Sequence, residues 1–486
     1  MGAPVDMAKL APARAAALDL AAQCRRKHAR MRDFLRTSHK MDVLGEKDRA
    51  LATRLLLGSV SAVGELDRVL ASYLPKRRHL EPKLRDALRL ATFEILYLHT
   101  PKHVAVSQGV EMARRASAQT TGLANAILRR IATDVSPRVD EAYARLRAGN
   151  DERLLEDLAH VSGQPDWLCQ KLVASMGASV ATSLLPHVLE PAPVYVALRE
   201  GLSHDMLSAF DPHASVAPQS FFLESPAGLA ASDLVARAKV LPADISSQLV
   251  ALLALSGREK TLLEIGQGRG TKTILLLQNA ALLNHALYIT AIDIDPQKVE
   301  TARKRLVEAA VDNQVTSVVF NAAELGAREV NGEPPCKLPG GLSDTFDTVF
   351  IDAPCSGAGT LQRHPEIGWS LDENAVCSDG ILPKVQKDIL VAASGKVAAH
   401  GTLVYATCSP LYEEDEAVVE AFLATEEGSS FEPEDITESA AFELLSDAGK
   451  QVVQKAQTKT GYAHFGYQPA ILDADQHFLA KLRRIG

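Results

Sequence analysis

Residues 261–282, TLLEIGQGRGTKTILLLQNAAL, run from a short apolar stretch through a glycine-rich turn into a helical pattern. A strand, turn and helix in this order open an α/β sheet of the type that binds ligands at the carboxyl ends of its strands. Further apolar runs follow, namely YITAID, VTSVVF, FDTVFID and GTLVYAT, with helical patterns among them. Strands that alternate with helices predict a doubly wound parallel sheet. We therefore expect an α/β domain over residues 256–486, with AHFGYQP and DQHFLAKLRR as antiparallel strands at the sheet edge.

The first part of the chain has a different pattern. Residues 1–140 carry apolar side chains at helical spacing without strand-like alternation, as in LRDALRLATFEILYL, which predicts an all-α domain of short helices. Residues 141–255 combine a polar helical connector with proline-rich stretches and one candidate strand, VYVALRE at 194–200. This middle segment is expected to form a connector and a small intermediate subdomain.

The charge of the chain is distributed unevenly. Its 486 residues include 52 Lys and Arg against 60 Asp and Glu, a formal net charge of −8, which by itself argues against a nucleic-acid partner. Residues 1–150, however, hold 27 basic and 15 acidic residues, whereas the rest of the chain holds 25 and 45. The basic clusters at 25–32, at 75–79 and at Arg129–Arg130 favour contact with RNA phosphates over plain solvated helix faces. The acidic run 413–437 is expected to be a solvated surface that cannot hold RNA.

Membrane insertion, secretion and structural metal binding are not indicated. The longest apolar runs, such as LVALLAL at 249–255, are far shorter than the roughly 20 residues of a membrane span, and the N-terminus has no signal-peptide layout. The six cysteines show no CxxC spacing, so neither a zinc site nor a disulfide framework is expected. These features predict a cytoplasmic protein with reduced thiols and no metal. Four thiols are expected to be small buried hydrophobic residues: Cys24, Cys169, Cys336 and Cys377.

The glycine-rich turn is a candidate ligand cradle. Gly266, Gly268 and Gly270 would let the backbone approach a ligand closely at the start of a helix, although an ordinary strand–helix turn fits these residues about equally well. Asp293 ends the next predicted strand, 23 positions after Gly270, close to the spacing of an acid that binds ribose hydroxyls. The combination favours a cofactor that contains a nucleoside. Asp295 fits the N-cap of the following helix.

Two cysteines and an acid lie at the ends of neighbouring predicted strands. Asp352 ends FDTVFID, Cys355 stands in the loop after it, and Cys408 follows GTLVYAT. Because the carboxyl ends of parallel strands meet at one edge of the sheet, both thiols are expected to face one pocket. A thiolate beside a cation is an activated nucleophile, and Lys272 in the glycine-rich turn is the candidate cation.

Two of these segments are distinctive enough to suggest a family. DAPCSGAGTLQRHPEIGW (352–369) and YATCSP (405–410) closely resemble motifs IV and VI of the RNA 5-methylcytosine methyltransferases, and TLLEIGQGRGTKT stands in the place of their motif I. The helical N-terminus resembles the NusB-like RNA-binding domain that is fused to such enzymes in the small-subunit ribosomal RNA methyltransferase B family (Sun/Fmu). The resemblance implies a NusB-like domain at 1–140 and a Rossmann-like methyltransferase domain at 256–486.

The resemblance also implies a methyl donor and roles for single residues. The donor would be S-adenosyl-L-methionine. Cys408 would attack carbon 6 of cytosine, which makes carbon 5 nucleophilic enough to take the methyl group, and Cys355 would assist removal of the carbon 5 proton and release of the enzyme. Asp352 would hydrogen-bond the base and Lys272 would orient the pocket. The implied donor-binding residues lie in the turn and at two strand ends: Gly266, Gln267, Gly268, Arg269, Gly270, Thr271, Lys272, Asp293 and Asp352.

The implied substrate is a cytosine of small-subunit (16S) ribosomal RNA, free of or early in subunit assembly, and the implied enzyme is a monomer. The target base must leave any stack to reach two thiols in a crevice, so a flipped or single-stranded base is expected. Two alternatives stay open. One is a transfer-RNA cytosine-5 methyltransferase, and the other is a catalytically weak NusB-like RNA-binding assembly factor.

Several positions depart from the family pattern. The turn lacks the usual proline and paired glycines, and the place of an adenine-contacting acid is taken by alanine. An Arg-x-Asn sequence and an Asp-Gly-Phe-Phe sequence are also altered. Because both cysteines are kept, the enzyme is nevertheless expected to be active. The departures lie at Gln267 to Thr271, Ala322–Ala323, Leu198–Arg199–Glu200 and Asp475–Gln476–His477–Phe478.

Overall fold

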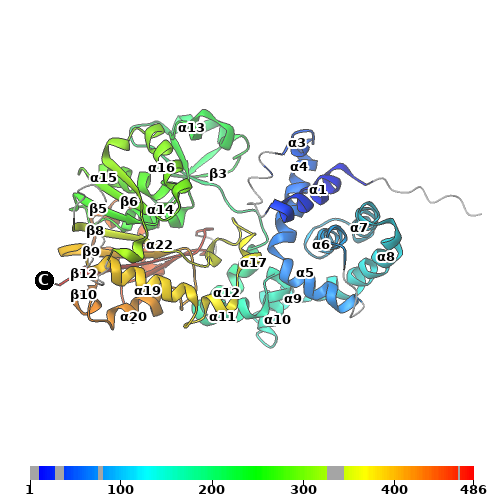
Figure 1. Ribbon diagram of the computed structural model, residues 1–486. Coiled ribbons are helices and arrows are strands. Elements are labelled where there is room, and N and C mark those ends of the chain that lie inside the picture. Colours follow the sequence, from blue (N-terminus) through cyan, green and yellow to red (C-terminus); the bar gives the residue numbers. More distant parts are fainter. Residues whose placement is uncertain are drawn as a thin grey trace, which may run out of the picture. The chain divides into compact units, whose positions relative to one another are not determined.

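The computed structural model contains two compact units of the chain (Figure 1), and it describes residues 10–27, 35, 38–74, 80–325, 344–468 and 471–485, without the side chains of 369 and 370. The helical unit comprises Met1–Pro191 together with Leu361–Leu371, and the sheet unit comprises Ala192–Thr360 and Asp372–Gly486. By this grouping residues 141–191 go with the helical unit and residues 192–255 with the sheet unit. The sequence-based division at 140 and 255 stays a prediction about domains.

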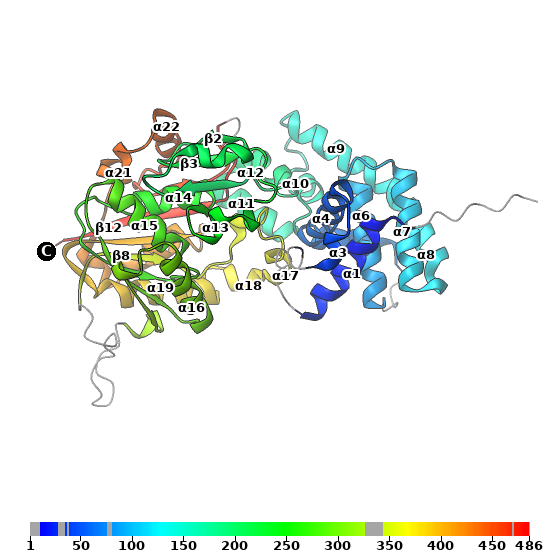
Figure 2. The ribbon, with the colours of Figure 1, turned by 90° about the horizontal axis from the view of Figure 1, so that it is seen from above.

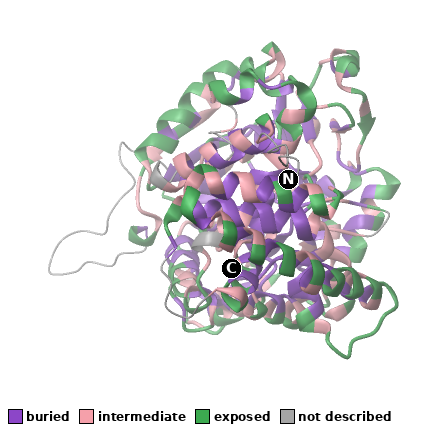
Figure 3. Ribbon diagram, turned by 90° about the vertical axis from the view of Figure 1, so that its right-hand side faces the viewer, coloured by how far each residue is buried: buried purple, intermediate pink, exposed green. Residues whose placement is uncertain are grey.

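The described part of the helical unit is all-α, which confirms the prediction for the N-terminal region. Its central helix is α6 (Pro82–Tyr97), which packs against α1 (Pro12–Lys27), α4 (Glu46–Ser61) and α7 (Lys102–Ala116) (Figure 2). Figure 3 shows that its helices carry buried residues on their inner sides and exposed residues on their outer sides. Among the described residues, the other α-helices of this unit are α3 (His39–Asp42), α5 (Val63–Tyr73), α8 (Thr121–Arg130), α9 (Ser136–Arg147), α10 (Leu154–Ser162), α11 (Asp166–Met176), α12 (Ala178–Leu184) and α17 (Ile367–Ser370).

The packing of α6 explains a small residue in its neighbour α4. Phe93 of α6 is fully buried, and a Cβ built on Gly58 of α4 would lie 1.9 Å from Cζ of its ring. Only glycine lets these two helices approach this closely, because no side chain fits beside the ring.

The main sheet of the sheet unit has the order β10-β12-β9-β8-β5-β6-β7, with β11 paired to β12. The five strands from β9 to β7 are parallel, as predicted, and β12 is antiparallel to β9. The predicted antiparallel pairing at the C-terminus is confirmed, but β12 is not the edge because β10 lies outside it. The strands are β5 (Thr261–Ile265), β6 (Tyr288–Asp293), β7 (Val315–Val319), β8 (Phe346–Asp352), β9 (Val397–Thr407), β10 (Phe431–Pro433), β11 (Ala463–Phe465) and β12 (His477–Arg484).

Helices cover both faces of this sheet (Figure 1). Alternate residues of β8 point to opposite faces, so Phe350 joins one hydrophobic core while Val349 and Ile351 join the other. The first core takes side chains from α14 (Ile245–Leu253), α15 (Thr271–Leu282), α16 (Pro296–Glu308) and α22 (Asp447–Ala456). The second takes them from α19 (Ile381–Ser394) and α20 (Glu416–Leu423). This doubly covered sheet confirms the predicted α/β class.

A second, smaller sheet was only partly foreseen. It has four antiparallel strands in the order β2-β3-β1-β4, which are β2 (Pro212–Ala214), β3 (Ser220–Leu223), β1 (Tyr195–Leu198) and β4 (Val240–Pro242). The predicted strand VYVALRE contains β1. All four strands are only three or four residues long, and the other three lack a readable alternation. Among the described residues, no helix is long and apolar enough to cross a bilayer.

Candidate active site

The glycine-rich turn follows β5 and meets the end of β8. Gly266, Gly268 and Gly270 all have positive φ, at 86°, 58° and 76°, a region that side chains disfavour. A Cβ on Gly266 would lie 2.3 Å from the carbonyl oxygen of Asp352. Because Gly266 has no side chain, the turn after β5 can pack directly against the end of β8.

The acid predicted to bind ribose hydroxyls lies against this turn. Asp293, at the end of β6, accepts a hydrogen bond at Oδ2 from the Gly268 amide (2.8 Å) and at Oδ1 from the Asp295 amide (2.9 Å). Each carboxylate oxygen keeps a second lone pair for a ligand. Asp295 caps α16 by accepting from the Gln297 amide (2.8 Å), which confirms that prediction.

Two acceptor oxygens lie buried beneath the turn without a hydrogen-bond partner in the described part of the chain: Oε1 of Glu264 and Oε1 of Gln267. Gln267 uses its amide nitrogen to donate to Ser317 Oγ (2.9 Å), and Glu264 Oε2 accepts from Thr273 Oγ1 (2.6 Å). Burial raises the pKa of Glu264 to about 8, although the hydrogen bond from Thr273 opposes the shift. Sequence reasoning passed over Glu264; the available signal was an acid inside an apolar run.

The four residues predicted to carry the chemistry lie together at the ends of β8 and β9. The Sγ atoms of Cys355 and Cys408 are 3.3 Å apart, and both residues are half-buried. Lys272 Nζ donates to Asp352 Oδ2 at 2.8 Å. Burial alone lowers the pKa of Lys272, but the charge of Asp352, their hydrogen bond and the two thiols raise it more, so the net pKa lies above its usual value. The lysine is therefore a fixed positive charge in this site.

The thiol of Cys355 is perturbed by its neighbour and by burial. The hydrogen bond with Cys408 and burial, in that order, raise the pKa of Cys355 well above its usual range. Cys355 is consequently a protonated thiol at rest, and it becomes a strong base once it has lost that proton.

The start of β12 supports both cysteine loops. Gly359, in the loop after Cys355, donates its amide to the Cys408 carbonyl oxygen (3.0 Å) and accepts from the Gln476 amide (2.9 Å). The altered family position His477 is buried, and its Nδ1 lies 2.8 Å from Ser246 Oγ. The hydrogen-bonded pair of His477 and Ser246 therefore occupies the place of a phenylalanine in the family sequence Asp-Gly-Phe-Phe.

The expectation of a solvated acidic run is wrong for two of its acidic residues. Glu414 and Asp415 have no exposed surface, because the loop after β9 folds under the strand ends instead of facing water. Glu414 accepts from both the amide and the hydroxyl of Ser356 and from the Ser409 hydroxyl. Asp415 Oδ1 accepts from Thr407 Oγ1 (2.6 Å).

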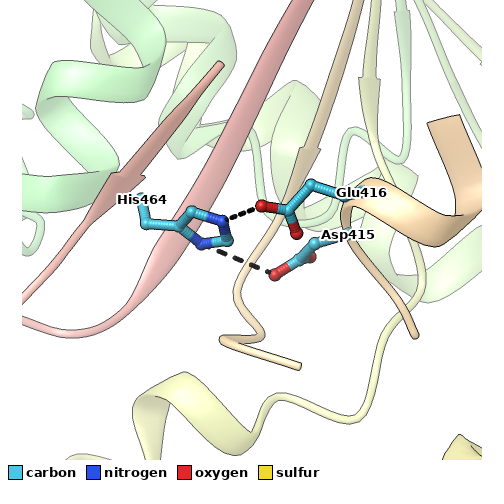
Figure 4. A group of neighbouring side chains, drawn as sticks. All are labelled: Asp415, Glu416 and His464. Atoms are coloured by element: carbon cyan, nitrogen blue, oxygen red, sulfur yellow. Dashed lines mark hydrogen bonds and ion pairs between the residues drawn. The ribbon is translucent and has the colours of Figure 1, made fainter. Parts of the chain in front are cut away.

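Asp415 and Glu416 also surround an imidazole (Figure 4). Nε2 of His464 lies 2.6 Å from Glu416 Oε1, and its Nδ1 lies 3.9 Å from Asp415 Oδ2. One ligand atom of each residue lies within 4.8 Å of the other two, so the three side chains could hold a metal ion. In the geometry described, each ring nitrogen faces a different carboxylate. The arrangement is that of an imidazole bridging two acids.

Other positions singled out in the sequence have structural partners. Arg199 Nη1 donates to the Ala309 carbonyl oxygen (2.7 Å), and Ala322 and Ala323 begin a short 3₁₀ turn capped by Asn321. Arg269 is exposed. In the helical unit Arg25 pairs with Asp86 (2.8 Å). Cys336 and the basic residues at 28–32 and 75–79 lie outside the described residues.

Comparisons with known proteins decide the family. The model of the 16S rRNA methyltransferase RsmB/F family matches residues 250–483, and that of the NusB family matches residues 11–133. A Mycobacterium tuberculosis protein named "Putative methyltransferase Rv1407" is 30% identical over 386 residues, which cover 76% of this chain and 77% of the relative. The chain belongs to the RsmB/F family. This confirms the resemblance inferred from motifs IV and VI.

Further relatives and structures agree with this assignment. Proteins named "Ribosomal RNA small subunit methyltransferase B" from Sodalis glossinidius and Thermus thermophilus are 28% and 29% identical, and the matches cover 78% and 80% of this chain and 82% of each relative. The crystal structure of PH0851 matches with a TM-score of 0.69 at 18% identity over 99% of this chain and 100% of that chain. NSun6 from Pyrococcus horikoshii with SFG matches with a TM-score of 0.51 at 15% identity, over 66% and 98%. At these identities the structures show the fold alone.

Membership of the RsmB/F family makes the chain an RNA methyltransferase that uses S-adenosyl-L-methionine. The described residues fit this donor. Its ribose hydroxyls and amino groups need hydrogen-bond acceptors, and Asp293 at the end of β6 and the unpartnered Oε1 of Gln267 in the turn offer them. The altered turn therefore keeps the acceptors that such a donor requires.

Proposed function

We propose that this protein methylates carbon 5 of a cytosine in 16S ribosomal RNA through a covalent bond between Cys408 and the base. The observation that carries the proposal is the contact of two thiols, 3.3 Å apart, beside the Lys272–Asp352 ion pair. Cytosine carbon 5 is a poor nucleophile until a thiolate has added to carbon 6. A site with one thiol to add and a second to take a proton matches this need.

The steps can be assigned to residues. The Cys408 thiolate forms a bond to carbon 6, and the electron pair of the 5,6 double bond becomes available at carbon 5. Bound S-adenosyl-L-methionine supplies an electrophilic methyl group to that carbon. Cys355, after losing its own proton to solvent, then takes the proton from carbon 5 as a thiolate, and the returning electron pair restores the double bond as the sulfur of Cys408 leaves carbon 6.

Lys272 and Asp352 act on the orientation of the base and of the thiols. The Asp352 carboxylate would accept a hydrogen bond from the exocyclic amine of cytosine, and Lys272 would hold that carboxylate in place through its 2.8 Å contact. The positive charge of Lys272 also lies within electrostatic reach of both cysteine sulfurs. The target cytosine has to be flipped or single-stranded to reach Asp352 and the two thiols.

The test is base-resolution mapping of 5-methylcytosine in cells that lack this protein, with the purified protein and S-adenosyl-L-methionine added back to their RNA. We expect the loss, and the restoration, of one modified cytosine in 16S ribosomal RNA. Loss of transfer-RNA sites instead would establish the transfer-RNA alternative. An unchanged map would favour the catalytically weak assembly factor. We further propose that the enzyme acts as a monomer in the cytoplasm, on RNA that is free of or early in subunit assembly.

Donor binding is expected to depend on Asp293. The Asp293→Ala substitution removes the carboxylate proposed to accept from the ribose hydroxyls, and such charge-assisted bonds are worth about 1.5–3 kcal/mol. Calorimetry should therefore show the affinity for S-adenosyl-L-methionine weakened by roughly 10- to 100-fold. Asp295→Ala is the matched control, because it removes a neighbouring acid that caps α16; an equal loss of affinity in both variants would contradict the ribose assignment.

RNA binding and donor binding are expected to respond differently to salt. The proposed contacts between the basic N-terminal residues and phosphates release counterions, so RNA affinity should fall about 10³-fold or more between 50 and 200 mM salt if six or more phosphates are neutralised. Donor affinity, which rests on buried groups, should change little. Filter binding and calorimetry over the same salt series test this, and a flat RNA series would refute phosphate docking.

A further inference from the structure

The buried carboxylate of Glu414 lies between the two cysteine loops. Its Oε1 accepts from the Ser356 amide (2.8 Å) and from Gln386 Nε2 (3.0 Å), and its Oε2 accepts from the Ser356 hydroxyl (2.5 Å) and the Ser409 hydroxyl (2.6 Å). Ser356 directly follows Cys355, and Ser409 directly follows Cys408. One side chain therefore bonds the immediate neighbours of both thiols.

The hydroxyl groups that reach Glu414 have fixed orientations. Ser356 Oγ accepts from the Ala358 amide and Ser409 Oγ accepts from the Leu411 amide, both at 3.2 Å. Their protons are thus free to point at the carboxylate. Four donors meet the four principal acceptor positions of an ionised carboxylate, a number that an amide side chain cannot match.

Glu414 is itself held from outside the two loops. Its carbonyl oxygen accepts from the Tyr405 hydroxyl (2.7 Å), which lies in β9. Gln386 of α19 donates to Glu414 and also to the Pro354 carbonyl oxygen (2.9 Å). Glu414 is therefore bonded to the sheet through its backbone and to a helix through its carboxylate. These bonds can restrict the movement of both cysteine loops.

We propose that Glu414 is a positioning residue that sets the distance between the nucleophile Cys408 and the base Cys355. The inference rests on the proposed cysteine mechanism. A bridge of this kind matters because the two thiols act on adjacent carbons of one base, and a misplacement of about 1 Å can cost about 10²-fold in rate.

Besides its hydrogen bonds to the two cysteine loops, Glu414 affects the pKa of Cys355 through its negative charge. No Lys, Arg or His forms an ion pair with it within the described part of the chain, so its negative charge is held by hydrogen bonds alone. The Cys408 hydrogen bond and burial raise the pKa of Cys355 most, and the charge of Glu414 adds to the rise. Removing that charge should lower the pKa of Cys355 and move the proton-removal step to lower pH.

The alternative is that Glu414 only stabilises the fold. A purely structural role would lower the thermal unfolding temperature without changing the distance between the sulfur atoms. The decisive readout is therefore the geometry of the thiol pair in the folded, full-length protein, measured with phenylarsine oxide, a trivalent arsenical that bridges two thiols only when they lie close together.

The experiment compares Glu414→Gln, Ser409→Ala and Ser356→Ala with the unaltered protein, and uses Glu426→Gln as the matched control. Glu426 is an exposed acid in the same segment, so its substitution removes the same charge away from the thiols. For Glu414→Gln we expect kcat to fall about 10²-fold, with KM for S-adenosyl-L-methionine unchanged, weaker arsenical capture, and a pH profile shifted to lower pH. The serine variants, which each remove a single contact with Glu414, should show intermediate losses, and the control should show none.

Each outcome decides one of the two proposals. Unchanged kcat and unchanged arsenical capture in folded Glu414→Gln would overturn the positioning role. If that variant fails to fold, the same result in both serine variants would overturn it. If the unaltered protein captures the arsenical through Cys355 and Cys408 but methylates no cytosine, the positioning of the thiols stands and the proposed function fails.

Discussion

Replacing Cys408 with alanine is expected to abolish methyl transfer to ribosomal RNA. Without a thiolate at this position nothing adds to carbon 6 of the base, and carbon 5 remains too weak a nucleophile to take the methyl group. Loss of a covalent nucleophile lowers kcat by about 10⁴-fold or more, so turnover should fall to background. The measurement is transfer of isotopically labelled methyl groups from S-adenosyl-L-methionine to 16S ribosomal RNA.

Two controls make this result specific. Donor affinity of Cys408→Ala, measured by calorimetry, should equal that of the unaltered protein, because the turn after β5 is untouched. Cys377→Ala should keep full activity, since the Cys377 thiol donates to the Asn374 carbonyl oxygen and to Asp379 Oδ1, which lie outside the proposed site. Full turnover by Cys408→Ala would show that another group is the nucleophile.

Replacing Cys355 with alanine is expected to give a different defect, an enzyme trapped on its RNA. Cys408 can still add to carbon 6 and the methyl group can still be transferred. The proton on carbon 5 then has no base to take it, so the double bond is not restored and the sulfur does not leave. A protein–RNA adduct that survives denaturing electrophoresis should accumulate, with one methyl group on the bound cytosine.

The double variant separates this explanation from nonspecific cross-linking. Cys355→Ala combined with Cys408→Ala should form no adduct, because the bond to carbon 6 is never made. Mass spectrometry of the digested adduct should place the nucleotide on Cys408. Multiple turnover by Cys355→Ala, with free methylated RNA and no adduct, would assign proton removal to some other group.

The parts of the site that the sequence predicted are those set by short-range patterns. Asp293, Asp352 and Cys408 each lie at or just after the carboxyl end of an apolar run, and parallel strands bring such ends to one edge. The same reasoning predicted that the two thiols face one pocket, and in the structure their sulfur atoms lie 3.3 Å apart. Asp295 was predicted as an N-cap because capping depends only on the next two or three residues.

The parts that the sequence did not predict depend on distant contacts. Glu414 stands in an acidic run that looks like solvated surface, and its hydrogen-bond partner Ser356 is 58 positions away in the sequence. His477 was identified only as a lost aromatic, because its partner Ser246 is 231 positions away. Glu264 escaped notice since an acid in a strand is usually at the surface. Burial of charge is decided by the whole fold, which local patterns do not encode.

The grouping of Leu361–Leu371 with Met1–Pro191 means that the helical unit is completed late during synthesis. Helix α17 packs on α4 and α5, so the N-terminal unit emerges from the ribosome incomplete and waits for 180 further residues. At about 5–20 residues per second that interval lasts roughly 10–40 s, during which the surfaces of α4 and α5 meant for α17 stay uncovered. A truncated gene product ending at Pro191 would carry this gap permanently.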